Sequence, residues 1–136
     1  MSNDQERNEE YWRQKLTDEE FAICRKNGTE PAFSGKYHDE KAAGVYLCRC
    51  CEEPLFDSIS KYKSDSGWPS FFQPVNSDVI TEYKDSSYGM DRVETVCTKC
   101  GAHLGHVFKD GPEPTGLRYC TNSTSISLKK SNGVDG

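Results

Sequence analysis

Short segments with strand-like patterns recur along this 136-residue chain. Apolar and polar residues alternate over 78–83 and 92–96, as in β-strands with one solvent-exposed face. Apolar runs over 44–47 and 102–108 also suit strands, and Gly, Pro, Asp and Ser between the segments indicate turns. A longer strand over 117–128 is expected to close the fold. The pattern therefore predicts a mainly β, mostly antiparallel fold.

Two short helices are predicted before the first strand. Apolar residues spaced four apart predict a helix over 9–16. Thr17 and Glu20 form a capping-box pattern, which predicts a second helix over 18–26.

The composition is that of a polar, acidic chain. Hydrophobic residues make up 34% of the sequence, the net charge is −5 and the mean hydropathy is −0.83. So few apolar residues build a thin core at this length, and we expect a cross-link or a bound metal to add stability. Because there is no basic block, binding to nucleic acid or to an anionic membrane surface is not expected.

The length suits a single domain over 1–136, with flexible ends at 1–8 and 129–136. No apolar run approaches the ~20 residues of a membrane span. The acidic, polar N-terminus is unlike a signal or transit peptide. We therefore expect a cytoplasmic protein.

Four of the seven cysteines form two Cys-x-x-Cys pairs, Cys48 with Cys51 and Cys97 with Cys100. Each pair follows an apolar strand, as in a zinc knuckle, and four thiolates match the tetrahedral coordination of Zn²⁺. A closed site of this kind is structural and would supply the stability that a thin core lacks. Two disulfides, or one redox-active pair, are the alternatives for this spacing.

A fifth cysteine, Cys120, lies in the middle of the last predicted strand. Because side chains alternate along a strand, Arg118, Cys120 and Asn122 are expected on one face. A guanidinium near a thiol favours the thiolate, which is the nucleophilic form. The alternative is a half-buried structural cysteine in an edge strand.

Two histidines follow the second Cys-x-x-Cys pair. His103 and His106 are three residues apart and would point to opposite faces of a regular strand, but a bend at Gly105 would bring them together. With four cysteines filling a tetrahedral site, both are available for proton transfer near neutral pH. Each could instead be a hydrogen-bonded structural residue.

The segment 64–72 is a loop rich in aromatic residues. Trp68 is a candidate wall of a pocket for an apolar group, and Phe71 is a second candidate for substrate contact. The alternative for neighbouring Trp and Phe residues is ordinary core packing.

These motifs together resemble the B-type methionine sulfoxide reductases, over about residues 12–128. Chance does not reproduce so many motifs in one order. The similarity is carried by Leu16-Thr17, 28–35, Cys48-Arg49-Cys50-Cys51, 54–56, Gly67-Trp68-Pro69-Ser70-Phe71, 97–108, 110–112 and 115–123.

The resemblance implies a fold of two small antiparallel sheets, with one structural zinc held away from the active site. It implies reduction of methionine-R-sulfoxide in proteins, and weakly of the free form, as repair of oxidative damage. It also implies that the Cys120 thiolate attacks the sulfoxide sulfur and becomes a sulfenic acid.

The resemblance assigns roles to further residues. His103 matches the main proton donor, with His106 as its partner. Trp68 matches the residue that packs against the substrate methyl group. Arg118 and Asn122 match the residues that orient and activate the thiol.

One departure from the family pattern concerns recycling. Many members carry a resolving cysteine just before the Gly-Trp-Pro motif, where this chain has Ser66. A serine cannot form a disulfide with Cys120. We expect direct reduction by thioredoxin or another thiol reductant, and the alternative is a disulfide from Cys24, since Cys50 lies inside the zinc knuckle. A monomer acting on oxidised proteins is expected.

Two other function classes fit part of the pattern. A zinc-stapled binding module would explain the Cys-x-x-Cys pairs and Trp68, but it gives no reason for Arg118 and Cys120. A zinc hydrolase using His103 and His106 would need an open metal position, which four cysteine ligands do not leave.

Overall fold

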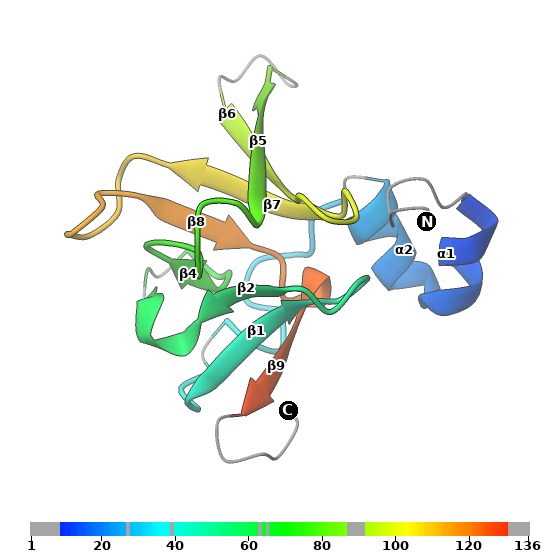
Figure 1. Ribbon diagram of the computed structural model, residues 1–136, viewed down its shortest axis with the longest axis horizontal. Coiled ribbons are helices and arrows are strands. Elements are labelled where there is room, and N and C mark those ends of the chain that lie inside the picture. The colour runs from blue at the N-terminus through cyan, green and yellow to red at the C-terminus, as the bar shows by residue number, and fades with distance from the viewer. Residues whose placement is uncertain are drawn as a thin grey trace.

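The computed structural model describes residues 9–26, 28–38, 40–62, 64, 66–86 and 92–130. Most of its helices and strands are labelled in Figure 1. The helices are α1 (Glu9–Lys15), α2 (Asp18–Arg25) and the short 3-10 helices η2 (Ser58–Ser60) and η4 (Ser123–Ser125). The strands are β1 (Gly44–Cys48), β2 (Pro54–Asp57), β3 (Lys61–Tyr62), β4 (Ser70–Phe71), β5 (Ile80–Asp85), β6 (Arg92–Cys97), β7 (His103–Phe108), β8 (Arg118–Thr121) and β9 (Ile126–Lys130).

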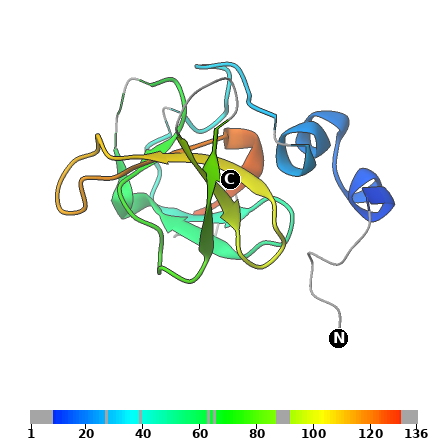
Figure 2. The ribbon, with the colours of Figure 1, turned by 90° about the horizontal axis from the view of Figure 1, so that it is seen from above.

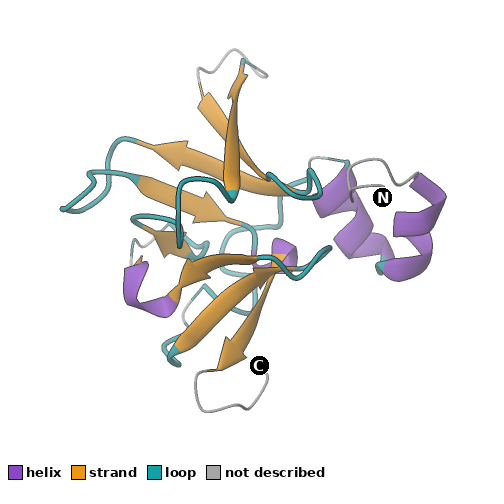
Figure 3. Cartoon of the chain, in the orientation of Figure 1, coloured by secondary structure: helices purple, strands orange, loops and turns teal. Residues whose placement is uncertain are grey.

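The strands form two sheets, drawn in orange in Figure 3. The smaller sheet has the order β2-β1-β9, and the larger has the order β3-β4-β8-β7-β6-β5. Neighbouring strands are antiparallel in both. The predicted fold, mainly β with two antiparallel sheets and short N-terminal helices, is therefore confirmed.

The two N-terminal helices lie to one side of the strands, as Figure 2 shows. The Thr17 hydroxyl accepts a hydrogen bond from the Glu20 N–H at 3.1 Å, and the Glu20 carboxylate accepts one from the Thr17 N–H at 3.0 Å. The predicted capping box thus begins α2. None of the helices in the described part of the chain has the length and hydrophobicity that a membrane span requires.

The chain over 117–128 does not form one strand, which corrects the prediction. β8 ends at Thr121, η4 turns the chain, and β9 joins the other sheet. The turn is stabilised by the buried carboxylate of Glu30, which accepts hydrogen bonds from the N–H groups of Ser123 at 2.9 Å and Thr124 at 3.0 Å. A segment distant in sequence therefore interrupts the stretch that was predicted to form one strand.

The described C-terminal end is also more ordered than predicted. Lys129 and Lys130 belong to β9 and pair with Val45 and Gly44 of β1, so they are not part of a flexible end. The rest of the predicted flexible ends, 1–8 and 131–136, lies outside the described residues.

Aromatic side chains pack the two sheets together. The rings of Phe56 and Phe71 stack with centroids 4.3 Å apart, and Tyr46 meets Phe71 edge-on at 5.1 Å. Complete burial of one such side chain contributes about 1.5–3 kcal/mol. Since these rings come from β1, β2 and β4, they hold the small sheet against the large one.

Candidate active site

The four cysteines of the Cys-x-x-Cys pairs form one cluster. The Sγ atoms of Cys48, Cys51, Cys97 and Cys100 all lie within 4.8 Å of one another. The Cys48–Cys100 and Cys51–Cys97 Sγ distances are each 3.6 Å. Tetrahedral zinc with Zn–S bonds of about 2.3 Å would place its sulfur ligands roughly 3.8 Å apart. The four thiols therefore have a spacing that fits one metal ion.

This cysteine cluster links the two sheets. One pair flanks the turn between β1 and β2, and the other flanks the turn between β6 and β7. The residue after each pair has a positive φ, 64° at Glu52 and 79° at Gly101. The N–H of each of these residues donates to the carbonyl of the first cysteine, at 2.8 Å and 2.7 Å. Two matching turns thus present four thiols to a common point.

Cys24, the alternative candidate for the resolving role, lies near the cysteine cluster. Its side chain is 1% exposed, it contacts the Cys50 thiol, and its Sγ is 3.8 Å from the Ser125 hydroxyl oxygen. Because α2 packs against η4 and β7, Cys24 is held in the part of the core that adjoins the cysteine cluster. The structure therefore does not bring Cys24 together with Cys120.

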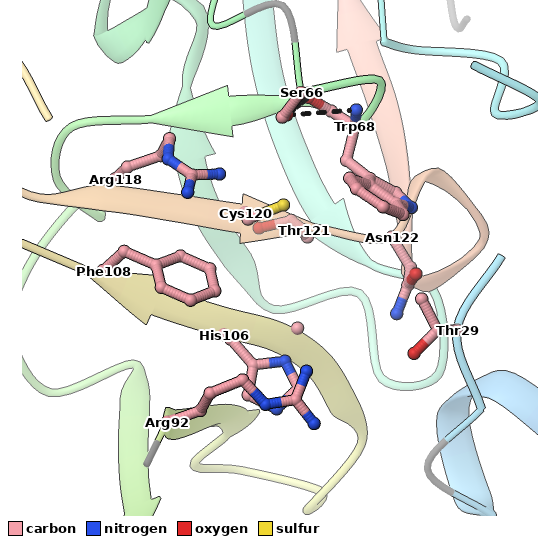
Figure 4. Close-up of a pocket in the computed structure, with 11 residues that line it drawn as sticks. Thr29, Ser66, Trp68, Arg92, His106, Phe108, Arg118, Cys120, Thr121 and Asn122 are labelled. Atoms are coloured by element: carbon pink, nitrogen blue, oxygen red, sulfur yellow. Dashed lines mark hydrogen bonds between the residues drawn. The ribbon is translucent and has the colours of Figure 1, made fainter. Parts of the chain in front are cut away.

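A cavity of about 250 Å³ lies over β7 and β8 (Figure 4). Most of the predicted site residues meet there, although they come from separate segments of the chain. The lining includes Trp68, His106, Arg118, Cys120 and Asn122, with Thr29, Ser66, Arg92 and Phe108 beside them.

Cys120 belongs to a row of paired residues that crosses the large sheet. The register aligns Ser70 of β4, Cys120 of β8, His106 of β7 and Glu94 of β6, so these side chains point to one face. Gly105 permits the close approach of β7 and β8, because a Cβ atom there would lie 1.9 Å from the Cys120 carbonyl oxygen. The Cys120 thiol and the His106 imidazole are therefore neighbours on adjacent strands.

Burial raises the pKa of the Cys120 thiol, opposite to the direction expected from Arg118 alone. The Arg118 guanidinium and a hydrogen bond with Ser66 lower this pKa, but by less than burial raises it. Arg118 also donates two hydrogen bonds to the Asp110 carboxylate, at 2.9 and 3.2 Å, and lies 4.5 Å from the Phe108 ring centroid. The thiol is therefore the resting form near neutral pH.

Trp68 forms a wall of the cavity, as predicted. Its indole N–H donates a hydrogen bond to the Glu30 carbonyl at 2.9 Å. The preceding Gly67 has a φ of 93°, a conformation that residues with a side chain rarely adopt. Together these features hold the indole beside Cys120.

Phe71 does not reach the cavity, which corrects the second candidate from the aromatic loop. Its side chain is 0% exposed and stacks on Phe56 in the core. Because side chains alternate along β4, Ser70 faces the row that contains Cys120, and Phe71 faces the opposite way.

Asn122 lines the cavity from beyond the end of β8. Its Oδ1 accepts a hydrogen bond from the Glu30 N–H at 3.1 Å, and its Nδ2 donates to the Leu104 carbonyl at 3.2 Å. Both polar atoms thus bind backbone groups. The side chain joins the segment around Glu30 to β7 and so shapes the cavity next to Cys120.

The two histidines lie on the same side of the sheet. The pairing of β6 with β7 shifts register between Gly105 and His103, which leaves Leu104 as an extra residue. One extra residue reverses the alternation of side chains, and the two imidazole centroids are 5.7 Å apart. The predicted bend near Gly105 is present as this β-bulge.

The two histidines differ in their access to the cavity. His106 lines it, whereas His103 is 3% exposed and lies behind. Burial lowers the pKa of His103, and the nearby Glu94 carboxylate acts in the other direction. Neither histidine belongs to the cysteine cluster. Access therefore favours His106 as the residue that meets a ligand.

The motifs do not single out the two carboxylates that contact the histidines, nor the arginine that contacts one of these carboxylates. Asp85 Oδ2 is 2.8 Å from His106 Nε2 and 3.3 Å from Arg92 Nη2. Glu94 Oε2 is 2.7 Å from His103 Nδ1. The pattern places Asp85 in a turn, whereas β5 extends through it. The sequence signals these residues only through the polar positions of the strand over 92–96. Which residues those positions contact depends on the order of the strands.

The chain is similar in sequence to known proteins. The SelR domain family model matches residues 16–130. Relatives named peptide methionine sulfoxide reductase MsrB include those of Saccharophagus degradans, 62% identical over 130 residues (96% of this chain, 97% of that protein), and Teredinibacter turnerae, 59% identical over 130 residues (96% of each). A third, from Acinetobacter baylyi, is 58% identical over 121 residues, 89% of this chain and 87% of that protein. With the motifs and the fold in agreement, the chain belongs to the SelR-domain family, the B-type methionine sulfoxide reductases.

Proposed function

We propose that this protein reduces methionine-R-sulfoxide residues of oxidised proteins to methionine. The proposal is carried by the meeting of the Cys120 thiol, the Trp68 indole and the His106 imidazole at one cavity. Reduction of a sulfoxide requires a sulfur nucleophile, a proton for the oxygen and a surface for the methyl group. The names of the relatives support the same activity.

The walls of the cavity suit a methionine side chain. Figure 4 shows the rings of Trp68 and Phe108 on either side of Cys120. The substrate methyl group and chain would pack against these rings, with the sulfoxide sulfur above the Cys120 thiol. Trp68 cannot easily turn away, because its N–H is bonded to the backbone.

The chemical step needs the thiolate of Cys120 and one proton. The S–O bond of the substrate breaks, an S–O bond to Cys120 forms as a sulfenic acid, and methionine is released. The Cys120 sulfur loses two electrons and the substrate sulfur gains two. Arg118 and Ser66 favour the thiolate as it forms, and His106 is the neighbouring imidazole able to protonate the oxygen.

Recycling proceeds through a thiol from another molecule. All seven cysteines are described, and among them only Cys120 lines the cavity. Ser66 lies next to it but cannot form a disulfide. Thioredoxin or another thiol reductant would reduce the sulfenic acid directly, releasing water. The alternative, a disulfide with Cys24, would require α2 to leave its place on η4.

The two recycling routes leave different products. Protein oxidised by one equivalent of substrate is digested and mapped by mass spectrometry, with Cys24→Ser in parallel. The direct route predicts no Cys24–Cys120 peptide and unchanged thioredoxin-dependent turnover in the variant. A Cys24–Cys120 linkage together with lost turnover would contradict it.

The cysteine cluster would hold one structural zinc ion. Its ligands would be Cys48, Cys51, Cys97 and Cys100, whose sulfur spacing fits tetrahedral coordination. A zinc ion held by these residues would cross-link the two sheets and would take no part in the reduction.

The function is tested with peptides that carry one sulfoxide epimer each, with dithiothreitol as reductant. The R epimer is expected to be consumed and the S epimer to be left intact. Cys120→Ser is expected to be inactive on both. Reduction of the S epimer alone, or of neither epimer by folded protein, would contradict the proposal.

A further inference from the structure

Each histidine of the active site is bound to its own carboxylate, and through a different ring nitrogen. His106 uses Nε2, which lies 2.8 Å from Asp85 Oδ2. His103 uses Nδ1, which lies 2.7 Å from Glu94 Oε2. Both carboxylates belong to the neighbouring strands β5 and β6.

An ionised carboxylate only accepts hydrogen bonds, so the ring nitrogen that faces it carries the hydrogen. A neutral imidazole has one N–H, and the carboxylate therefore determines the tautomer. In His106 the nitrogen left without a hydrogen is Nδ1, and in His103 it is Nε2. A further proton must bind at that nitrogen, and it is the proton that the ring can give away.

The two histidines also differ in the surroundings of the ring that carries the hydrogen-free nitrogen. His106 lies in the cavity beside Cys120, with 12% of its side chain exposed. His103 Nε2 is buried and has no hydrogen-bond partner among the described residues. Burial also lowers the pKa of His103, which keeps that ring neutral. The histidines are thus sorted into one ring that can meet substrate and one that supports it.

Asp85 reaches His106 from two strands away. Adjacent strands lie about 4.8 Å apart, and β6 separates β5 from β7. Arg92 of β6 pairs with Asp85 in the sheet register, and its Nη2 lies 3.3 Å from Asp85 Oδ2. The guanidinium therefore stabilises the ionised carboxylate in the position that reaches His106.

We propose that Asp85 is a positioning residue for the reduction, which fixes His106 in the tautomer whose Nδ1 delivers the proton to the sulfoxide oxygen. Glu94 fixes His103 in the opposite tautomer, as a neutral ring behind His106. This inference rests on the proposed function and adds the atom from which His106 donates and the residue that holds the ring. After the transfer, neutral His106 regains a proton from solvent.

The tautomers can be read in the wild-type protein without any variant. Nitrogen-15 NMR of the histidine rings, at a pH where the signals report neutral imidazole, distinguishes the two forms. The expected result is an Nε2–H tautomer for His106 and an Nδ1–H tautomer for His103. An Nδ1–H tautomer for His106 would overturn the proposal.

Kinetics of matched variants then separate positioning from mere support of the fold. A general acid contributes ~10²–10⁴-fold. We therefore expect kcat on a methionine-R-sulfoxide peptide to fall about 100-fold in Asp85→Ala and about 10-fold in Asp85→Asn, with KM within about twofold. The Asn variant keeps the shape of Asp85 but offers either N–H or C=O to the ring, so mixed His106 tautomers are expected.

The control variant is Glu82→Gln, three residues earlier on β5. Its exposed side chain projects from the opposite face of the strand. It is expected to leave kcat, KM and the His106 tautomer unchanged. Loss of kcat in Glu82→Gln equal to that in Asp85→Asn would show that charge on β5, rather than the bond to His106, is responsible, and would overturn the proposal.

A further comparison identifies the donor. Glu94→Gln is expected to lower kcat less than Asp85→Asn does and to leave the His106 tautomer unchanged. The reverse order would make His103 the donor and overturn the assignment. An inactive wild-type enzyme would instead refute the proposed function, whereas an active wild type with full kcat in Asp85→Ala refutes only this inference.

Discussion

Two regions of this protein are built around cysteines, and they use them in different ways. In the cysteine cluster, four thiols lie within 4.8 Å of one another and complete a site by themselves. In the cavity, Cys120 is the sole thiol of the seven, and its neighbours are an indole, an imidazole and a guanidinium. The first arrangement suits a metal that holds the fold, whereas the second suits a reaction.

The cysteine cluster and the cavity also differ in how far apart their residues lie in the sequence. Each half of the cluster is a local turn, in which two cysteines three residues apart are presented by the same backbone shape. The cavity draws on the segment around Thr29, the turn at Ser66 and the strands β7 and β8. A metal site can thus be assembled from two local motifs, while a reaction site needs the whole sheet order.

Removal of the Cys120 thiol should have the largest effect on activity. Cys120→Ser is expected to lose all measurable reduction of a methionine-R-sulfoxide peptide, because a serine hydroxyl is a far weaker nucleophile at neutral pH. The cluster is untouched, so zinc content and unfolding temperature should match the wild type. Appreciable turnover in this variant would show that another group carries the reaction.

Loss of a cluster cysteine should instead remove the fold. Cys97→Ser is expected to lose zinc and to unfold without a cooperative transition, because structural zinc contributes about 10–16 kcal/mol in small zinc domains. Metal analysis and thermal unfolding measure both effects, with Cys24→Ser as the matched control. A zinc-free protein that stays folded and active would contradict the structural role.

A smaller effect is expected from the wall of the cavity. Trp68→Ala removes the surface for the substrate methyl group, and an apolar contact of this size is worth about 1–3 kcal/mol. KM for the peptide should rise roughly tenfold, with a lesser change in kcat. Tyr83→Ala, which removes an exposed ring outside the cavity, is the control. Equal KM values in the Trp68→Ala variant and the wild type would show that the indole only fills space.

The recycling step offers a gain of function. Ser66 lies within hydrogen-bonding reach of Cys120, so Ser66→Cys should form a disulfide with Cys120 after one turnover. Thioredoxin-dependent turnover is expected to rise several-fold, since thioredoxin reduces disulfides by exchange. Mass mapping of substrate-oxidised protein should find this linkage, and its absence would contradict the geometry around Ser66.

The smallest effect concerns the titration of Cys120. Because burial raises its pKa, the thiol should persist as pH rises past the midpoint of an ordinary cysteine, and alkylation by iodoacetamide should accelerate only above that pH. Arg118→Met should move the midpoint higher still, since the guanidinium lowers this pKa. A midpoint below that of an unfolded cysteine would contradict this and would support the expectation from the sequence that Arg118 favours the Cys120 thiolate.

Several features of the fold were accessible from the sequence because they depend on near neighbours. The Thr17–Glu20 capping box is one turn long and starts α2 as predicted. The strands over 92–96 and 102–108 follow from local patterns, and the Cys-x-x-Cys spacing predicted the cluster. Resemblance to the family correctly indicated the two sheets.

Other residues were misplaced because their positions depend on distant segments. The single strand over 117–128 is broken where Glu30 bonds to the backbone of Ser123 and Thr124. Phe71 faces the core because β4 pairs with β8 through Ser70 and Cys120 in that register. Cys24 does not line the cavity that holds Cys120, because α2 packs on η4, a contact that no local pattern shows.

The sequence by itself determined which residues are candidates at the two cysteine sites, because the spacing of metal ligands, helix capping and the alternation of side chains act over a few residues. Only the tertiary structure decided which side chains meet. The order β8-β7-β6-β5 sets Cys120 beside His106 and brings Asp85 and Glu94 to the histidines. The physical reason is that hydrogen bonds and burial act between atoms close in space, and a sheet brings together strands that are far apart in the chain.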